Sequence, residues 1–557
     1  MTLFNHLRRT IPLLVLLIVT ACQSQPAAEI AVTVTPTPTD LRPTATHTPP
    51  LPEPTETTNP TNTPVPPTNT PENSATPLPP TPTETPESTT IASTLFDIPW
   101  DDRTIFQSGL LDSEQAVLSQ LPGATIYHLD LKIEADIVHL NGRQEIRYTN
   151  QEDQPLDKIV FRLFPNIAGG ASIVTNVTVD GEAIEPTFTL EQSAMELPLS
   201  FPLQSGEQLV IGMDVSIEVP ADQGGNYGTF AYLDQVMALA HFYPMIAVFD
   251  DEGWNVEIAP PIGDVVYADS SFYIVRITAP ADQTVVASGV EVSREVAGDQ
   301  QIITFAAGPM RDFYMAVSDT YVLTSRTVDG ITINSYAPAA LTEGSELTLD
   351  IAEASILSFN ERFGPYPYTE FDLISTTTSA LGIEYPGIVA LLNDLYEIDG
   401  QPQGTLLEAV VAHEVAHQWF YALVGNDQVD EPWLDEAMAQ FATTVYYSDV
   451  YGPSGGDRFR SSLERRWNRV DKADIAIGQP VRAYTPSEYG AIVYGRGPLF
   501  IEALSMAMTP EVFADFIKVY YQQYRWQIAT GEDYKQLAEQ FCDCDLTALF
   551  EEWVYPQ

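Results

Sequence analysis

Cysteine is scarce in this chain, whose 557 residues include only three Cys, too few for a framework of disulfide bonds. Cys542 and Cys544 are two positions apart, so in an oxidising compartment they either form a bridge or stay as free thiols. The pair alone is not expected to bind a metal, because no other Cys lies near it and no His follows it. Histidine is also rare, with seven in the chain, which gives weight to any motif that uses two.

Basic residues are few as well: 25 Lys and Arg stand against 76 Asp and Glu, and the formal net charge is −51. Such a field repels nucleic acid and anionic lipid, so no nucleic acid is expected among the partners. An acidic surface favours cationic substrates or a saline medium, although solubility alone is a sufficient reason for it.

Long apolar runs are missing beyond the first 22 residues, so no transmembrane helix is predicted. Residues 1–21 are predicted to be a signal peptide, because Arg8 and Arg9 precede an apolar stretch too short to span a bilayer. Residues 19–22, Val-Thr-Ala-Cys, resemble a bacterial lipobox, which predicts a lipid on Cys22. The protein would then be exported and anchored, extracytoplasmic, to the bacterial cell membrane; the alternative is an ordinary secretory signal with an incidental Cys.

Proline and threonine make up 37 of the 60 residues from 31 to 90. This composition cannot pack a core, so residues 22–94 are predicted to be a lipid-anchored, disordered linker. His47 lies in this tract and is not expected to be a metal ligand.

Short strands with turn signals follow in residues 95–327 and predict an N-terminal all-β, sandwich-like domain. From residue 127 to 164, polar and apolar positions alternate (Leu129, Leu131, Ile133, Ala135), and Asn141-Gly142 is a hairpin signal. Further strands are predicted at 173–179, 208–219, 272–278 and 301–305. No residue type here forms a site by itself, so support of a site elsewhere is the expected role.

Residues 328–557 combine strands with helices, so the fold class is predicted to be a multidomain α+β protein. Strands are expected at 331–337 and 371–375, with an amphipathic helix at 348–363 between them. The end of the chain is predicted to be mostly helical, at 458–468, 498–508, 510–524, 533–541 and 546–554.

A possible metal site occupies the middle of this second region, in His413-Glu414-Val415-Ala416-His417. Residues 406–423 are apolar on nearly every side and predict a buried helix that Thr405 caps and Gly425 ends. Two His four residues apart project from one face of a helix and can bind one tetrahedral ion. Glu414 points roughly 100° away from His413, which leaves it free to act on water.

A third ligand, Glu436, is predicted on a second helix that begins near Pro432. Two His and one Glu leave one position of a zinc ion open, as catalytic sites do and structural sites do not. Alternatively, Glu436 is an exposed acid in the first turn of its helix, where the dipole favours it. An accidental H-E-x-x-H is rare in a chain with seven His, so one Zn2+ per chain is predicted.

These motifs, with eighteen residues between His417 and Glu436 and with Trp433-Leu434-Asp435-Glu436, resemble the aminopeptidase N family of zinc metallopeptidases (gluzincins). The best fit is to its short bacterial members, and the resemblance covers about residues 97–557. It implies that residues 328–557 form a thermolysin-like, α/β-to-helical catalytic domain behind the β-domain.

The resemblance also implies roles for two further residues. Glu384 lies where the family has G-x-M-E-N, with Leu381, Ile383 and Tyr385 in place of Gly, Met and Asn, and would bind the substrate's free amine. As an alternative, Glu384 is a strand-edge acid that aids solubility. Tyr494 lies in a segment similar to the family's Y-x-K-G and would donate a hydrogen bond to the oxyanion, with Tyr484 and Tyr489 as nearby competitors.

The function implied is that of a zinc-dependent aminopeptidase that hydrolyses N-terminal residues from peptides at the cell surface, with Glu414 as general base. Two alternatives remain: a gluzincin endopeptidase without a free-amine requirement, and an inactive surface binding protein with a structural zinc. An intact Glu414 argues against the second, since a structural site has no use for it. Side-chain preference, physiological substrate and oligomeric state stay open.

Overall fold

The computed structural model describes residues 95–398 and 401–555. The predicted signal peptide, the linker, Cys22 and His47 lie outside these residues and stay predictions. Among the helices of the described residues, none has the length and apolar character that crossing a bilayer requires.

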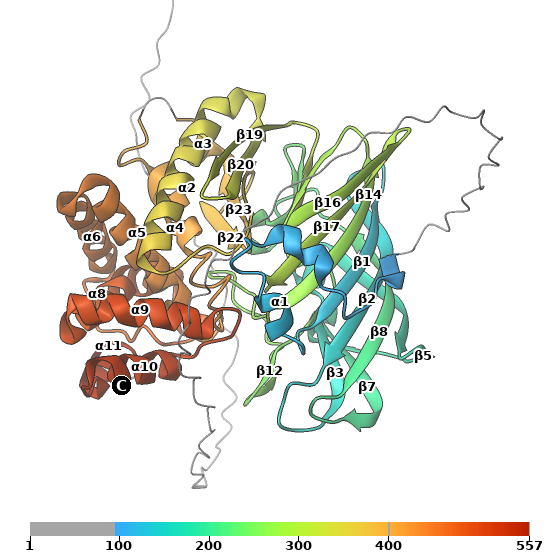
Figure 1. The fold of residues 1–557 in the computed structure, drawn as a ribbon, viewed down its shortest axis with the longest axis horizontal. Helices are drawn as coiled ribbons and strands as arrows, with labels where there is room; N and C mark the ends of the chain where they lie inside the picture. The colour runs from blue at the N-terminus through green and yellow to red at the C-terminus, as the bar shows by residue number, and fades with distance from the viewer. Residues whose placement is uncertain (1–94, 399–400, 556–557) are drawn as a thin grey trace, which may run out of the picture. The chain divides into compact units, whose positions relative to one another are not determined.

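An eight-stranded sheet forms most of the first region, which Figure 1 shows in blue and green. β1 and β14 pair in parallel in this sheet, and the other neighbours are antiparallel. The strand order is β16 (Val290–Ala297), β17 (Gln300–Met310), β14 (Ser271–Pro280), β1 (Ile126–Ile133), β2 (His139–Thr149), β8 (Gln208–Glu218), β4 (Ala171–Val179) and β5 (Glu182–Ala183).

Two four-stranded sheets and a short hairpin complete the β-rich region. One sheet has the order β15 (Thr284–Ala287), β18 (Met315–Ser318), β10 (Val236–Leu239) and β9 (Phe230–Leu233). The other has the order β11 (Met245–Ile246), β3 (Leu156–Arg162), β7 (Ala194–Leu203) and β6 (Thr187–Thr189), and β12 (Phe249–Asp250) pairs with β13 (Gly253–Trp254). The expectation of an N-terminal β region is confirmed.

The first hairpin turns earlier than Asn141-Gly142, so that part of the prediction is wrong. The turn lies at residues 134–138, where the amide of Glu134 donates to the carbonyl of His139 over 2.8 Å and Ile137 has a positive φ of 59°. Ala135 is exposed in this turn and does not continue the alternation. Gly142 lies inside β2, where a Cβ would come within 2.0 Å of the Asp130 carbonyl oxygen. This glycine therefore permits close strand contact, and its type alone does not distinguish that role from a turn.

A five-stranded mixed sheet begins the second region, in the order β19 (Tyr321–Val328), β20 (Ile331–Pro338), β21 (Glu370–Thr376), β23 (Ile388–Leu392) and β22 (Gly382–Tyr385). β20, β21 and β23 run parallel, whereas β22 is an antiparallel edge strand. The predicted boundary between residues 327 and 328 falls in the hairpin of β19 and β20, so strand pairing places β19 with the second sheet.

One long helix lies between β20 and β21 in the chain, and the remaining helices of this region follow β23, as Figure 1 shows in yellow to red. Each helix predicted from the sequence is present; the helix predicted at 510–524 has these bounds, and the others differ at one end or at both. Their bounds are α2 (Thr342–Arg362), α3 (Asn393–Tyr396), α4 (Leu406–Ala416), α5 (Trp433–Tyr451), α6 (Pro453–Trp467), α7 (Pro486–Ala491), the π-helix η9 (Ile492–Arg496), α8 (Gly497–Met508), α9 (Pro510–Tyr524), α10 (Gly531–Cys542) and α11 (Thr547–Trp553); the β-rich region adds α1 (Val117–Gln120).

Helix α4 ends at Ala416, seven residues before the predicted end at Leu423. Thr405 caps its start as expected, accepting a hydrogen bond from the amide of Glu408 over 3.2 Å. At the other end Arg311, from the β-rich region, donates to the carbonyls of Tyr421 and Leu423 over 2.9 and 3.2 Å. Gly425 lies directly under the guanidinium, because a Cβ there would be 2.0 Å from its carbon atom. The apolar run after His417 is thus buried by tertiary contact and not by a continued helix.

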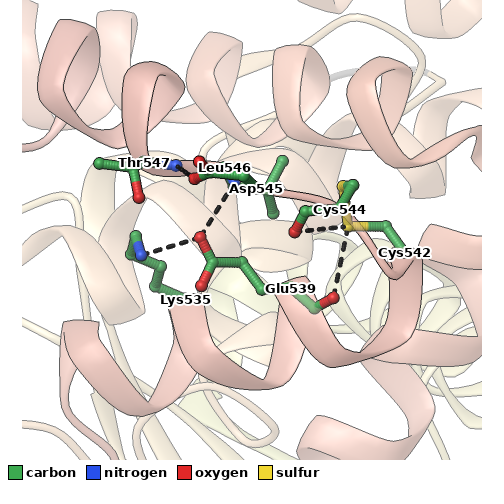
Figure 2. The surroundings of a disulfide bond; sticks show 7 residues. All are labelled: Lys535, Glu539, Cys542, Cys544, Asp545, Leu546 and Thr547. Carbon is green, nitrogen blue, oxygen red and sulfur yellow. Dashed lines mark hydrogen bonds and ion pairs between the residues drawn. A yellow bond between two sulfur atoms is a disulfide. The ribbon is translucent and has the colours of Figure 1, made fainter.

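The two C-terminal cysteines form a disulfide bond, Cys542–Cys544, so of the two states left open by the sequence the structure has the bridged one. Figure 2 shows it at the end of α10. The nearby carboxylate of Glu539 pairs with Lys535 over 2.8 Å and accepts from the amide of Leu546 over 3.0 Å. The bridge and this carboxylate together hold the short connection between α10 and α11.

Candidate active site

Three side chains converge where α4 and α5 contact each other. Nε2 of His413 lies 3.2 Å from Nε2 of His417, and Oε2 of Glu436 lies 3.1 and 3.5 Å from these nitrogens. All three residues are buried. His413 on α4 and His417, the residue that follows its end with helical dihedral angles, keep the i, i+4 spacing that brings the imidazoles together, and the first turn of α5 brings the carboxylate.

These separations fit a single bound metal ion. A tetrahedral zinc with ligands at about 2.0–2.1 Å has ligand–ligand distances of about 3.3 Å, close to the 3.1–3.5 Å found. Two imidazole nitrogens and one carboxylate oxygen are also a donor set that zinc prefers. Burial lowers the pKa of His413 to about 4, which keeps this imidazole in the neutral form that binds a metal.

The neighbours of His417 decide which of its nitrogens faces the ion. Nδ1 lies 3.1 Å from the carbonyl oxygen of Phe420, to which only a protonated nitrogen can donate. Nε2 therefore carries the free lone pair. Glu384, Glu414 and His417 form a second possible metal group, but there Glu384 lies 3.9 Å from Nδ1, the nitrogen already used. The group with Glu436 fits better.

Glu414 lies beside the triad in the same cavity, which has a volume of about 270 Å³. Burial raises the pKa of Glu414 well above its usual range, and the charge of Glu384 adds to this, so Glu414 is a stronger base than an exposed glutamate. Gly382 of β22 packs against it, since a Cβ there would come within 2.6 Å of Oε1. The edge strand thus restricts where the Glu414 carboxylate can lie.

Glu384 also lines this cavity and is held from two sides. Its Oε1 accepts from Nε2 of Gln428 over 3.0 Å, and the same nitrogen donates to Asp435 over 2.7 Å. Gln418 fixes the turn after β22, because it accepts from the amide of Gly387 over 2.9 Å and donates to the carbonyl of Tyr385 over 3.0 Å. Glu384 is therefore buried and positioned, unlike a solvated strand-edge acid.

The β-rich region contributes directly to the cavity through Tyr227, Ile262, Gly263 and Asp264. Burial raises the pKa of Asp264 well above its usual range, and the charge of Glu384 raises it further. No site residue was expected in this region from the sequence, because no residue type there forms a site by itself. Arg311 joins the two regions, since it donates to Ala268 of the β-rich part as well as to the loop after His417.

Tyr494 is brought to the site by the π-helix η9, and its hydroxyl hydrogen-bonds to Oε1 of Glu436. Single π turns inside helices are frequent at functional sites. Of the competitors, Tyr484 donates to the backbone carbonyls of Ala476 and Ile477, and Tyr489 does not line the cavity. Arg496, in the family's Lys position, does not line the cavity. It forms an ion pair with Asp474, with 2.7 Å between the nitrogen and the oxygen.

A site with three metal ligands and an adjacent free carboxylate is the arrangement of metal-dependent hydrolases. Residues 347–553 match the model of the peptidase family M1 domain. The chain is 26% identical over 410 residues to an aminopeptidase N of Lactobacillus delbrueckii subsp. lactis, covering 68% of this chain and 46% of that protein. An aminopeptidase N of Lactococcus lactis subsp. lactis is 24% identical over 444 residues, covering 71% and 50%.

The fold is similar to that of the M1 zinc metallopeptidase from Deinococcus radiodurans, with a TM-score of 0.58 and 19% identity over 81% of this chain and 96% of that one. The expected resemblance to the aminopeptidase N family and the expected fold class are thus confirmed. The chain spans about half the length of the Lactobacillus and Lactococcus aminopeptidases that it matches.

Proposed function

We propose that this protein is a zinc-dependent aminopeptidase that removes N-terminal residues from peptides. The observation that carries the proposal is one cavity that holds both the His413, His417 and Glu436 triad and the buried carboxylate of Glu384. A carboxylate in a desolvated cleft attracts an ammonium group far more strongly than an exposed one does. The similarity to proteins described as aminopeptidase N supports the same activity.

One zinc ion per chain is proposed, on His413, His417 and Glu436. When bound, zinc supplies a Lewis acid that polarises the substrate carbonyl and lowers the pKa of water to near neutral. Glu436 fits as a ligand because it is buried among the imidazoles and is not an exposed acid of the first helical turn.

Glu414 and Tyr494 carry the remaining chemistry in this proposal. Glu414 accepts a proton from the attacking water and passes it to the leaving amine, a role that its raised pKa and its place in the cavity favour. Tyr494 donates a hydrogen bond to the charge that develops on the carbonyl oxygen. One preorganised donor of this kind stabilises a transition state by roughly 3 kcal/mol.

Glu384 pairs with the terminal ammonium of the peptide, with Asp264 next to it in the same cavity. This contact places the first peptide bond at the triad, so cleavage removes one residue at a time. An endopeptidase would have no need of a buried acid at this position.

The test compares leucine amides of a fluorogenic amine with a free and with an acetylated leucine amine. We expect acetylation to lower kcat/KM of the parent protein by about 100-fold or more, because it removes a buried charge-assisted hydrogen bond. In Glu384→Ala the free substrate should become nearly as poor as the acetylated one, with zinc content unchanged. Glu397→Ala, an exposed acid outside the cavity, is the control and should behave as the parent. Internal cleavage of blocked peptides as fast as free ones would mean an endopeptidase.

The place of action is part of the proposal. We propose export and attachment to the bacterial membrane through a lipid on Cys22, supported by the sequence of residues 1–22. Peptides outside the cytoplasm would then be the substrates, and no role with nucleic acid is proposed.

A further inference from the structure

A second cavity of about 790 Å³ adjoins the one at the metal triad. The two share the lining residues Leu406, Ala409, Phe459 and Arg466, so they lie side by side, and we refer to them together as the cleft. A peptide longer than two residues that is cut at the triad has room to extend into the second cavity.

Arginines of α6 and of the turn after it line this second cavity, at positions 458, 465, 466 and 469. The spacing places them along one helical face, together with Phe459 and Ser462. Among residues 95–398 and 401–555, no Asp or Glu lines the cavity, although the chain has 76 acidic residues against 25 basic ones. We call these four arginines the arginine groove. It is a positive site in a strongly negative protein.

These arginines lack the partners that other arginines of the protein have. Within the described residues, the side chains of Arg465, Arg466 and Arg469 make no ion pair and no hydrogen bond. The side chain of Arg458 hydrogen-bonds only to the hydroxyl of Ser454, over 3.5 Å. Arg460 on the same helix, by contrast, pairs with Glu464 over 2.7 Å and Glu502 over 2.6 Å. Guanidinium donors that line one cavity without an acceptor favour an anionic ligand.

An acid and an arginine lie near different members of the triad. Glu384 lies 3.9 Å from Nδ1 of His417. The ring of Tyr494 lies 5.9 Å from that of His413, and the guanidinium of Arg466 lies 6.0 Å from the Tyr494 ring. A peptide bound with its ammonium at Glu384 therefore directs its carboxyl-terminal part toward the arginine groove.

We propose that the arginine groove binds carboxylates on the C-terminal side of the scissile bond, and so selects short or acidic peptides. The proposal rests on the proposed aminopeptidase function and adds a substrate class to it. Two carboxylates have the required chemistry: the free C-terminus of a tripeptide and the side chain of an Asp or Glu. Partly exposed guanidinium–carboxylate contacts support a preference of about five- to twentyfold.

The test uses the zinc-loaded full-length protein and three peptides: Leu-Ala-Ala with a free C-terminus, its C-terminal amide, and Leu-Ala-Asp amide. We expect kcat/KM for the free acid to exceed that for its amide about five- to twentyfold. Leu-Ala-Asp amide recovers the difference if a side-chain carboxylate also fits, and stays low if only the C-terminus does. The preference should weaken with added salt, since the groove is solvated.

The variant Arg465→Gln/Arg469→Gln should abolish the preference and leave hydrolysis of leucine p-nitroanilide, which does not reach the groove, unchanged. Arg460→Gln, on the same helix but paired with Glu464 and Glu502, is the matched control and should keep the preference. Equal kcat/KM for the acid and the amide in the parent protein, or an unchanged ratio in the double variant, would overturn the proposal.

Binding separates this proposal from the proposed activity. Calorimetry with Leu-Ala-Ala and its amide on Glu414→Gln measures the preference without turnover. If no free-amine substrate is cleaved but the acid still binds more tightly and the double variant loses this difference, the aminopeptidase function fails and the groove stands. If neither peptide binds more tightly than the other, the groove fails.

Discussion

At the scale of single residues, two buried glutamates of the site are driven in opposite directions by their neighbours. Burial by itself raises the pKa of Glu436, but the adjacent imidazoles of His413 and His417 hold it well below its usual range. For Glu414, burial and the charge of Glu384 act together and raise the pKa. Glu436 is therefore kept ionised, as a metal ligand must be, whereas Glu414 can act as a base. The two glutamates differ in these roles because their surroundings differ.

Exchanging Glu414 for Gln tests this division of roles. Glu414→Gln keeps the size of the side chain and removes its ability to accept a proton, so kcat should fall by about 10²–10⁴ with zinc retained. Glu436→Ala removes a ligand atom and should lose zinc and activity together. Metal analysis by mass spectrometry with steady-state kinetics separates the two. Comparable turnover in Glu414→Gln would place the chemistry on another residue.

At the scale of elements, the edge strand β22 and helix α4 contact each other closely at the site. The contact is possible because residue 382 has no side chain: a Cβ would meet Cγ, Cδ and Oε1 of Glu414 within 2.7 Å. Gln418 fixes the same strand through Gly387 and Tyr385. The position of the general base is thus set jointly by a helix and by a strand about thirty residues earlier in the chain.

A methyl group at residue 382 should therefore displace the carboxylate. We expect Gly382→Ala to lower kcat/KM about tenfold or more, because a shift of about 1 Å at a catalytic group costs up to 10²-fold. Zinc content should not change, since no ligand is touched. Gly490→Ala is the control, as nothing lies within 4 Å of a Cβ there, and it should retain full activity. Full activity in Gly382→Ala would show that Glu414 has room to move without loss.

At the scale of the whole molecule, one hydrophobic cluster runs through both regions, from Leu129 and Val275 of the eight-stranded sheet to Phe359 of α2 and Val411 of α4. Arg311 reinforces this union with its hydrogen bonds to both regions. The cavity at the triad accordingly takes part of its wall from the β-rich region. The β-rich region was expected only to support the site, but it also contributes Asp264 to the cavity.

The proposed membrane attachment is a property of the full chain. Cys22→Ser should remove the lipid and move the protein from the membrane fraction to the soluble extracytoplasmic fraction, because the acyl chains supply the binding free energy. Cys544→Ser, which breaks the local disulfide of the C-terminal part, should stay with the membranes. Fractionation followed by immunoblotting measures both. A Cys22→Ser protein that still sediments with membranes would contradict the lipobox interpretation.

The sequence by itself determined the features that depend on local spacing. His413 and His417 share a helical face because α-helices repeat every 3.6 residues, and Thr405 caps α4 because of its position before Leu406. The helices from α8 to α11 and the strands β20 and β21 were likewise readable from periodicity and turn residues. Each of these depends on a chain segment of fewer than about twenty residues.

Tertiary structure alone decided the rest, because it depends on which distant segments approach each other. Arg311, about a hundred residues earlier in the chain, holds the segment after α4 through the carbonyl of Tyr421, and the role of Gly142 follows from the neighbouring strand β1. Asp264 and the arginine groove line the cleft only through folding, and Gln428 reaches Glu384 in the same way, since each is an ordinary polar residue in its own segment. The periodicity of a segment shows which of its faces must be buried. Long-range packing decides which distant segment buries that face.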